Sequence, residues 1–133
     1  MLSLGDAREV RTAEDVVIVR QAVRQRAVEL GFSLVDQTKL VTAASELARN
    51  LVQHAGGGIV TVETENDGGR RGVRVIFEDH GPGIENTELA MRDGYSTAGG
   101  LGLGLGGAKR LSNDFKIESV PGKGTRIVIA RWK

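Results

Sequence analysis

Cysteine is absent from this sequence of 133 residues, and histidine occurs only twice, at His54 and His80. The lack of cysteine excludes a disulfide scaffold, a catalytic thiol and a thiolate zinc site, and it fits the reducing cytoplasm. Two separated histidines exclude a histidine-rich metal site. An excess of one charge is lacking too, because 18 Lys and Arg are matched by 17 Asp and Glu. With a net charge of +1, we expect neither a nucleic-acid partner nor a membrane partner.

A long apolar run is also missing. The longest stretch without a charged residue, Gly94 to Ala108, is too short for a transmembrane helix and is interrupted by glycine. The chain does not begin with a basic region followed by an apolar run, so we expect no signal peptide and a cytoplasmic location. The length fits one domain, residues 1–133, and 40% hydrophobic residues fit an ordinary globular core.

The spacing of apolar residues predicts an α+β fold. Thr12 or Asp15 is expected to cap the first helix, and Asp36 to lie at the start of the second. Helices packed on one face of a mostly antiparallel sheet make a two-layer sandwich. The predicted helices are 13–30, 36–55 and 104–113; the predicted strands are 7–12, 59–65, 72–79, 115–120 and 125–132, with a turn at 66–69.

A first candidate motif lies on the second predicted helix, where Glu46 and Asn50 are four residues apart. This spacing places both side chains on one face of the helix, beside the apolar stripe that contains Leu40, Leu47 and Leu51. Residues at such an edge can line a cleft between helix and sheet. The pair by itself also fits an ordinary solvated helix face.

Two further candidates follow strands. Asp79 comes at the end of a predicted strand, and Gly81 and Gly83 behind it allow the backbone to approach a ligand closely. A carboxylate there can accept a hydrogen bond from an exocyclic amine such as that of adenine, although Asp and Gly are also common in ordinary turns. Thr125, in the turn between the last two strands, offers a hydroxyl near a base or a bound water.

Glycine is the residue type in excess, at 19 of 133, and it is concentrated between Gly99 and Gly107, interleaved with leucine. Consecutive glycine amides before a helix can converge on an anion, so this segment is a candidate phosphate cradle. A flexible linker is the other interpretation, but linkers favour serine over leucine. The sequence contains neither a P-loop motif nor the strand that should precede a Rossmann glycine motif.

The order of these motifs resembles the GHKL ATPase family, which includes gyrase, Hsp90, histidine kinases and MutL. The resemblance covers roughly residues 36–130. Within the family, the segments 45–50, 78–84, 94–102 and 108–111 are similar to the small serine/threonine switch kinases of the RsbT type. These kinases are related to the anti-sigma-factor kinases RsbW and SpoIIAB. One departure is Gly106–Gly107, where a proline is expected, and it puts the behaviour of the lid in doubt.

The resemblance implies a Bergerat ATP-binding fold and a role for each matching residue. Glu46 would be the general base and Asn50 the Mg²⁺ ligand, while Asp79 would bind the adenine amine of ATP. Lys109 is interpreted as a solvated cation rather than a phosphate ligand. The remaining implied ATP-binding residues are Gly81 and Gly83 near the base, Ser96 and Thr97 in the lid, Gly102 and Gly104 at the phosphates, and Thr125 in support of Asp79.

The implied reaction is transfer of the ATP γ-phosphate to a Ser or Thr of a STAS-domain partner in stressosome signalling. The resemblance also implies that the released kinase binds and activates a PP2C-type phosphatase through its regulatory region. Three alternatives stay open: an anti-sigma-factor kinase, an isolated histidine-kinase catalytic domain, and a nucleotide-binding module without transfer activity. The presence of both Glu46 and Asn50 argues against the last of these.

Overall fold

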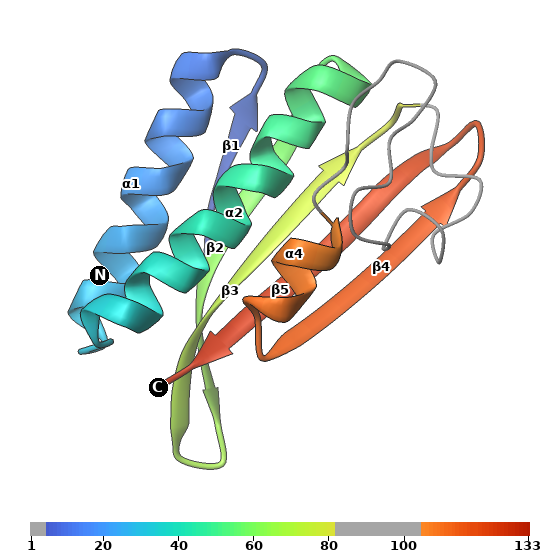
Figure 1. Ribbon diagram of the computed structural model, residues 1–133. Coiled ribbons are helices and arrows are strands. Elements are labelled where there is room, and N and C mark those ends of the chain that lie inside the picture. Colours follow the sequence, from blue (N-terminus) through green and yellow to red (C-terminus); the bar gives the residue numbers. More distant parts are fainter. Residues whose placement is uncertain (1–4, 82–104) are drawn as a thin grey trace.

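The computed structural model describes residues 5–81 and 105–133, which form a five-stranded sheet with helices on one face (Figure 1). All neighbouring strands are antiparallel, in the order β1-β2-β3-β5-β4. The expected α+β two-layer sandwich is therefore confirmed. The elements are β1 Gly5–Val10, α1 Ala13–Glu29, α2 Leu34–Ala55, β2 Gly58–Asp67, β3 Arg70–Asp79, α4 Leu105–Arg110, β4 Asp114–Val120 and β5 Gly124–Trp132.

Local capping explains where the two long helices begin. Thr12 caps α1: its hydroxyl accepts from the backbone N–H of Asp15, and the Asp15 carboxylate accepts from the N–H of Thr12. The predicted start of the second helix at Asp36 was wrong by one half-turn. Ser33 is the N-cap of α2, because its hydroxyl accepts from the N–H of Asp36, which therefore lies inside the first turn.

Three other predicted boundaries also shift. The strand expected at 7–12 is β1, two residues earlier, because Thr12 is needed as a cap. The turn expected at 66–69 is a tight connection through Gly68 and Gly69, both with positive φ, so β2 and β3 continue further than predicted. The helix expected at 104–113 ends at Arg110, since the backbone N–H of Asn113 already bonds to Ala130 of the sheet.

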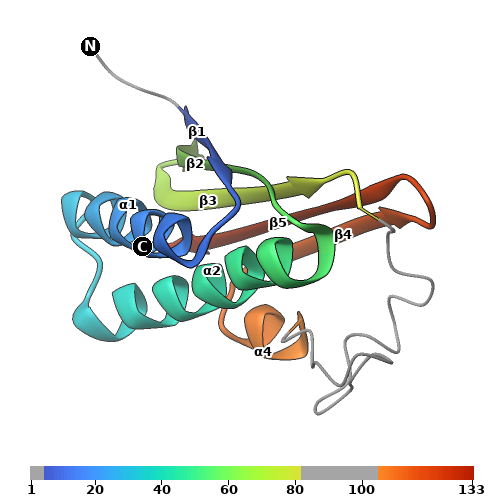
Figure 2. The same cartoon turned by 90° about the horizontal axis from the view of Figure 1, so that it is seen from above.

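The core lies between the helices and one face of the sheet. Helices α1, α2 and α4 all cover this face, as the view from above shows (Figure 2). The apolar stripes of the two long helices are buried, including the predicted Leu40, Leu47 and Leu51, and so is one face of β3. The buried residues of these three stripes are Val16, Val19, Val23, Ala27 and Leu30, then Leu40, Ala44, Leu47 and Leu51, then Val73, Val75 and Phe77.

Arg131, at the end of β5, connects this strand to α2 and to the residue that follows α4. Its guanidinium donates to Oδ1 of Asp36 in α2 at 2.9 Å and to the carbonyl oxygen of Leu111, just after α4, also at 2.9 Å. The hydrogen bond from Arg131 lowers the pKa of Asp36. The side chain of Arg131 is only 13% exposed, so this connection fixes α4 against α2.

None of the helices within residues 5–81 and 105–133 combines the length and the apolar character that crossing a bilayer requires.

We predict that Gly58→Ala destabilises the protein by about 1–3 kcal/mol. A Cβ at this position would overlap the carbonyl oxygen of Glu78 and lie 3.0 Å from Cδ2 of Leu51, so the backbone of β3 and the buried Leu51 side chain would have to move. Urea unfolding measures the loss. As a control, Gly107→Ala meets only Arg110 at 3.9 Å and should stabilise α4 by roughly 0.5–1 kcal/mol. Equal stability of the two variants would contradict this account of the packing.

Candidate active site

A row of polar side chains crosses three neighbouring strands at the end of the sheet where β3 ends. Asp79 of β3 is paired with Thr125 of β5, which is paired with Ser119 of β4. Directly paired residues point to the same side of a sheet. The alternate residues Phe77 and Ile127 are buried on the helix side, so this polar row also faces the helix layer.

Asp79 is held in a turn that uses only one of its carboxylate oxygens. Its Oδ1 accepts from the backbone N–H of Gly81 at 2.8 Å, as in an Asx turn. No described residue donates to Oδ2, although Asp79 is half-buried. The turn therefore fixes the direction of the carboxylate and leaves one oxygen to accept from a ligand.

The end of α2, the helix that carries Glu46 and Asn50, lies against this turn (Figure 1). A Cβ added to Gly81 would lie 2.9 Å from Cβ and 3.1 Å from Cα of Ala55, the last residue of α2. Only glycine allows this approach without displacing the helix. The contact places α2 over the end of β3, as a site shared by the two elements requires.

Glu46 and Asn50 lie one turn apart on α2, both partly buried at the edge of its apolar stripe. The Glu46 side chain is 41% exposed, and its Oε1 lies 3.5 Å from Nη1 of Arg49. An ion pair this exposed contributes at most about 1 kcal/mol, so Glu46 stays accessible to an incoming group. With this placement, a carboxylate can serve as a general base and an amide oxygen can serve as a metal ligand.

Two residues of this region were not singled out from the sequence. Ser119 places its hydroxyl 2.8 Å from that of Thr125, a contact that depends on the register of β4 and β5. His54 follows Asn50 by a further helical turn, and its Nε2 is buried without a partner in the described part of the chain. The regular spacing of Glu46, Asn50 and His54 was the available signal for the histidine.

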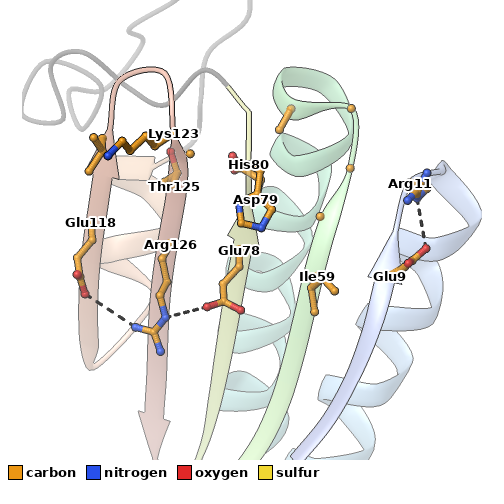
Figure 3. Close-up of a pocket in the computed structure, with 16 residues that line it drawn as sticks. Glu9, Arg11, Ile59, Glu78, Asp79, His80, Glu118, Lys123, Thr125 and Arg126 are labelled. Carbon is orange, nitrogen blue, oxygen red and sulfur yellow. Dashed lines mark hydrogen bonds and ion pairs between the residues drawn. The ribbon is translucent and has the colours of Figure 1, made fainter.

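A cavity of about 850 Å³ opens at the same end of the sheet but mostly on the face away from the helices (Figure 3). Asp79 and Thr125 line it, whereas Glu46 and Asn50 do not. Three charged side chains line the cavity in a row across the strands. Arg126 lies in the middle, with its Nε 3.1 Å from Oε1 of Glu78 and its Nη1 3.9 Å from Oε1 of Glu118. This cavity is therefore distinct from the site between α2 and the sheet, and Asp79 and Thr125 lie at the boundary between the two.

Five of the predicted site residues lie outside the described part of the chain. They are Gly83, Ser96, Thr97, Gly102 and Gly104. The glycine-rich phosphate cradle thus stays a prediction. Lys109, in α4, is exposed, and its interpretation as a solvated cation stays a prediction.

Residues 35–133 match the family model described as histidine kinase-, DNA gyrase B-, and HSP90-like ATPase. The chain is 48% identical over 123 residues to the serine/threonine-protein kinase RsbT of Bacillus subtilis, with 92% of each chain covered. It is also 29% identical over 128 residues to the anti-sigma F factor of Clostridium kluyveri, covering 92% of this chain and 89% of the relative.

Solved structures share the fold. The RsbU and RsbW domains of Rv1364c from Mycobacterium tuberculosis superimpose with a TM-score of 0.64 at 21% identity, covering 96% of this chain and 33% of that chain. The catalytic domain of the histidine kinase ThkA gives a TM-score of 0.55 at 16% identity, with 95% of each chain covered. At these identities the likeness concerns the fold alone.

We predict that stability falls as the pH is lowered below about 6.5, and that His54 causes part of the loss. Burial lowers the pKa of His54 in the folded protein, so the unfolded chain binds its proton at a higher pH. Urea unfolding between pH 7.5 and 5.5 should show this slope, and His54→Gln should reduce it. His80 is exposed, and His80→Gln is the matched control. A slope unchanged by His54→Gln would refute the assignment.

Proposed function

The chain belongs to the histidine kinase-, DNA gyrase B- and HSP90-like ATPase family, and we propose that this ATP-dependent serine/threonine protein kinase phosphorylates a STAS-domain protein. The observation that carries the proposal is the contact between α2 and the turn after β3, because it joins the helix bearing Glu46 and Asn50 to the strand end bearing Asp79. Two of the segments that resemble the family, 45–50 and 78–84, lie on α2 and at the end of β3.

The adenine of ATP would bind at the polar row of the sheet end. Oδ2 of Asp79 accepts a hydrogen bond from the exocyclic amine of adenine. Because the acceptor is a charged carboxylate, this hydrogen bond is stronger than one to a neutral acceptor. Thr125, paired with Asp79 across the strands, supports the base directly or through a water. The phosphates then extend along α2 toward Asn50 and Glu46.

Mg²⁺ fits the donors on α2. Within the described ranges, no group of three or more His, Asp or Glu side chains is placed to hold a metal ion. Mg²⁺ needs no such group, because it binds through one or two protein oxygens together with substrate phosphates and water. The amide oxygen of Asn50 would be the protein ligand, and the ion would neutralise charge on the phosphates.

Glu46 would act as the general base. Its carboxylate takes the proton from the Ser or Thr hydroxyl of the protein substrate as that oxygen bonds to the γ-phosphorus. The bond from the γ-phosphorus to the bridging oxygen breaks, and ADP leaves. Most of the acceleration comes from positioning and charge stabilisation, so a small domain can carry the reaction.

The partner assignment rests on similarity to the RsbT kinase, at 48% identity. We propose that phosphorylation releases the kinase from its STAS-domain partner in the cytoplasm, and that the released kinase activates a PP2C-type phosphatase. The 29% identity to anti-sigma F factors supports a second candidate, an anti-sigma-factor kinase that sequesters a sigma factor. The pocket and the chemistry would be the same, and only the partner would differ.

We predict that Glu46→Gln lowers phosphate transfer by roughly 100-fold or more while MgATP binding stays near that of the wild type, since amide and carboxylate have the same shape but only the carboxylate accepts the proton. Calorimetric binding of MgATP and transfer rates separate the two effects. Asp79→Asn is the matched control and should lose binding instead. Transfer at the wild-type rate by Glu46→Gln would remove Glu46 from the mechanism.

We expect the purified kinase with labelled ATP and Mg²⁺ to place acid-stable label on a STAS-domain protein. Phosphoserine and phosphothreonine survive acid, whereas phosphohistidine does not, so acid lability would point to histidine-kinase chemistry. Pull-downs against a sigma factor and a phosphatase regulatory region complete the test. Binding to the sigma factor alone would favour the second candidate.

A further inference from the structure

We propose that Ser119 is a positioning residue for the base end of the nucleotide site, acting through the hydroxyl of Thr125. This inference rests on the proposed function, in which Thr125 supports adenine binding by Asp79. Ser119 lies on β4, at the edge of the sheet, and is separated from Asp79 by the whole width of β5. It therefore does not need to touch the nucleotide to affect how the nucleotide binds.

Two contacts of Ser119 place its hydroxyl beside that of Thr125. Its Oγ lies 2.8 Å from Oγ1 of Thr125 and 3.3 Å from the carbonyl oxygen of Gly124. A carbonyl oxygen can only accept, so donation by Ser119 to Gly124 leaves its Oγ as the acceptor for the Thr125 proton. The Thr125 lone pairs are then open to a donor from the ligand or its water. In the alternative arrangement, Ser119 donates to Oγ1 of Thr125, and the Thr125 hydroxyl can then donate its own proton to the ligand or its water.

Either arrangement restricts the rotation of the Thr125 side chain. A threonine in a strand has few preferred χ1 rotamers, and a hydrogen bond to a neighbouring strand selects one of them. The selected rotamer keeps Oγ1 within the row formed with Asp79 rather than replacing it by the methyl group. A preoriented hydroxyl loses less rotational freedom when a ligand binds, which favours binding.

The strands that carry this row are held together on both sides of the sheet. On the opposite face, one residue along each strand, Arg126 lies between Glu78 and Glu118, at 3.1 and 3.9 Å (Figure 3). At the turn, a Cβ on Gly124 would overlap the carbonyl oxygen of Asp79, so β5 starts in close contact with the end of β3. This support fixes the distance that the Ser119 hydroxyl has to span.

We predict that Ser119→Ala raises the Kd for MgATP about fivefold to tenfold and that Ser119→Thr, which keeps the hydroxyl, restores binding. In a Thr125→Val background, Ser119→Ala should cause no further loss, because the group it positions is gone. Calorimetry with MgATP measures all four chains of this cycle. Thermal unfolding of each chain, compared with its binding, separates a local effect from a loss of folding.

Thr38→Ala is the matched control, since the Thr38 hydroxyl donates to the Leu34 carbonyl in the first turn of α2 and faces solvent. Its MgATP affinity should equal that of the wild type. If Thr125→Val weakens binding and Ser119→Ala does not, the role of Ser119 is refuted and the proposed function stands. If Thr125→Val binds MgATP as well as the wild type, the placement of adenine at this row is itself wrong. An equal loss from Ser119→Ala in both backgrounds would refute action through Thr125.

Discussion

The site depends on the close approach of α2 to the end of β3, where Ala55 lies against Gly81. A helix and a strand far apart in the sequence are brought within van der Waals distance because one residue has no side chain. The contact sets the helix carrying Glu46 and Asn50 over the strand end carrying Asp79. The rest of the described structure supports this contact. The buried stripe of α2 packs against the sheet, and Arg131 of β5 binds Asp36, near the start of α2, and the carbonyl oxygen of Leu111, after α4.

The two faces of the sheet end carry different chemistry because adjacent residues of a strand point in opposite directions. Asp79 and Thr125 face the helices, and their chain neighbours Glu78 and Arg126 face away. The first pair offers hydrogen-bonding groups to a ligand, while the second closes an ionic row that includes Glu118. The large cavity belongs mainly to the ionic face. A kinase of this size can work with so few groups because phosphoryl transfer depends on placement and charge rather than on covalent intermediates.

Much of the fold could be predicted because its periodicities are local. Helical spacing relates Val16, Val19 and Val23, and the alternation of a strand relates Val73, Val75 and Phe77. All six side chains are buried. Element ends were less predictable where two residues compete for one role. Ser33 rather than Asp36 caps α2, and two glycines of positive φ replace a longer turn between β2 and β3. Those choices depend on backbone hydrogen bonds that the order of residue types does not specify.

The sequence by itself determined which side chains are available and which of them share a helix face or follow a strand: Glu46 with Asn50, and Asp79 before Gly81. The tertiary structure decided which of these groups meet. The register of β4 and β5 brought Ser119 to Thr125, and packing buried Nε2 of His54 beside the site. The physical reason is that helix and strand periodicity act over a few residues, whereas strand register and helix docking are set by contacts between distant segments.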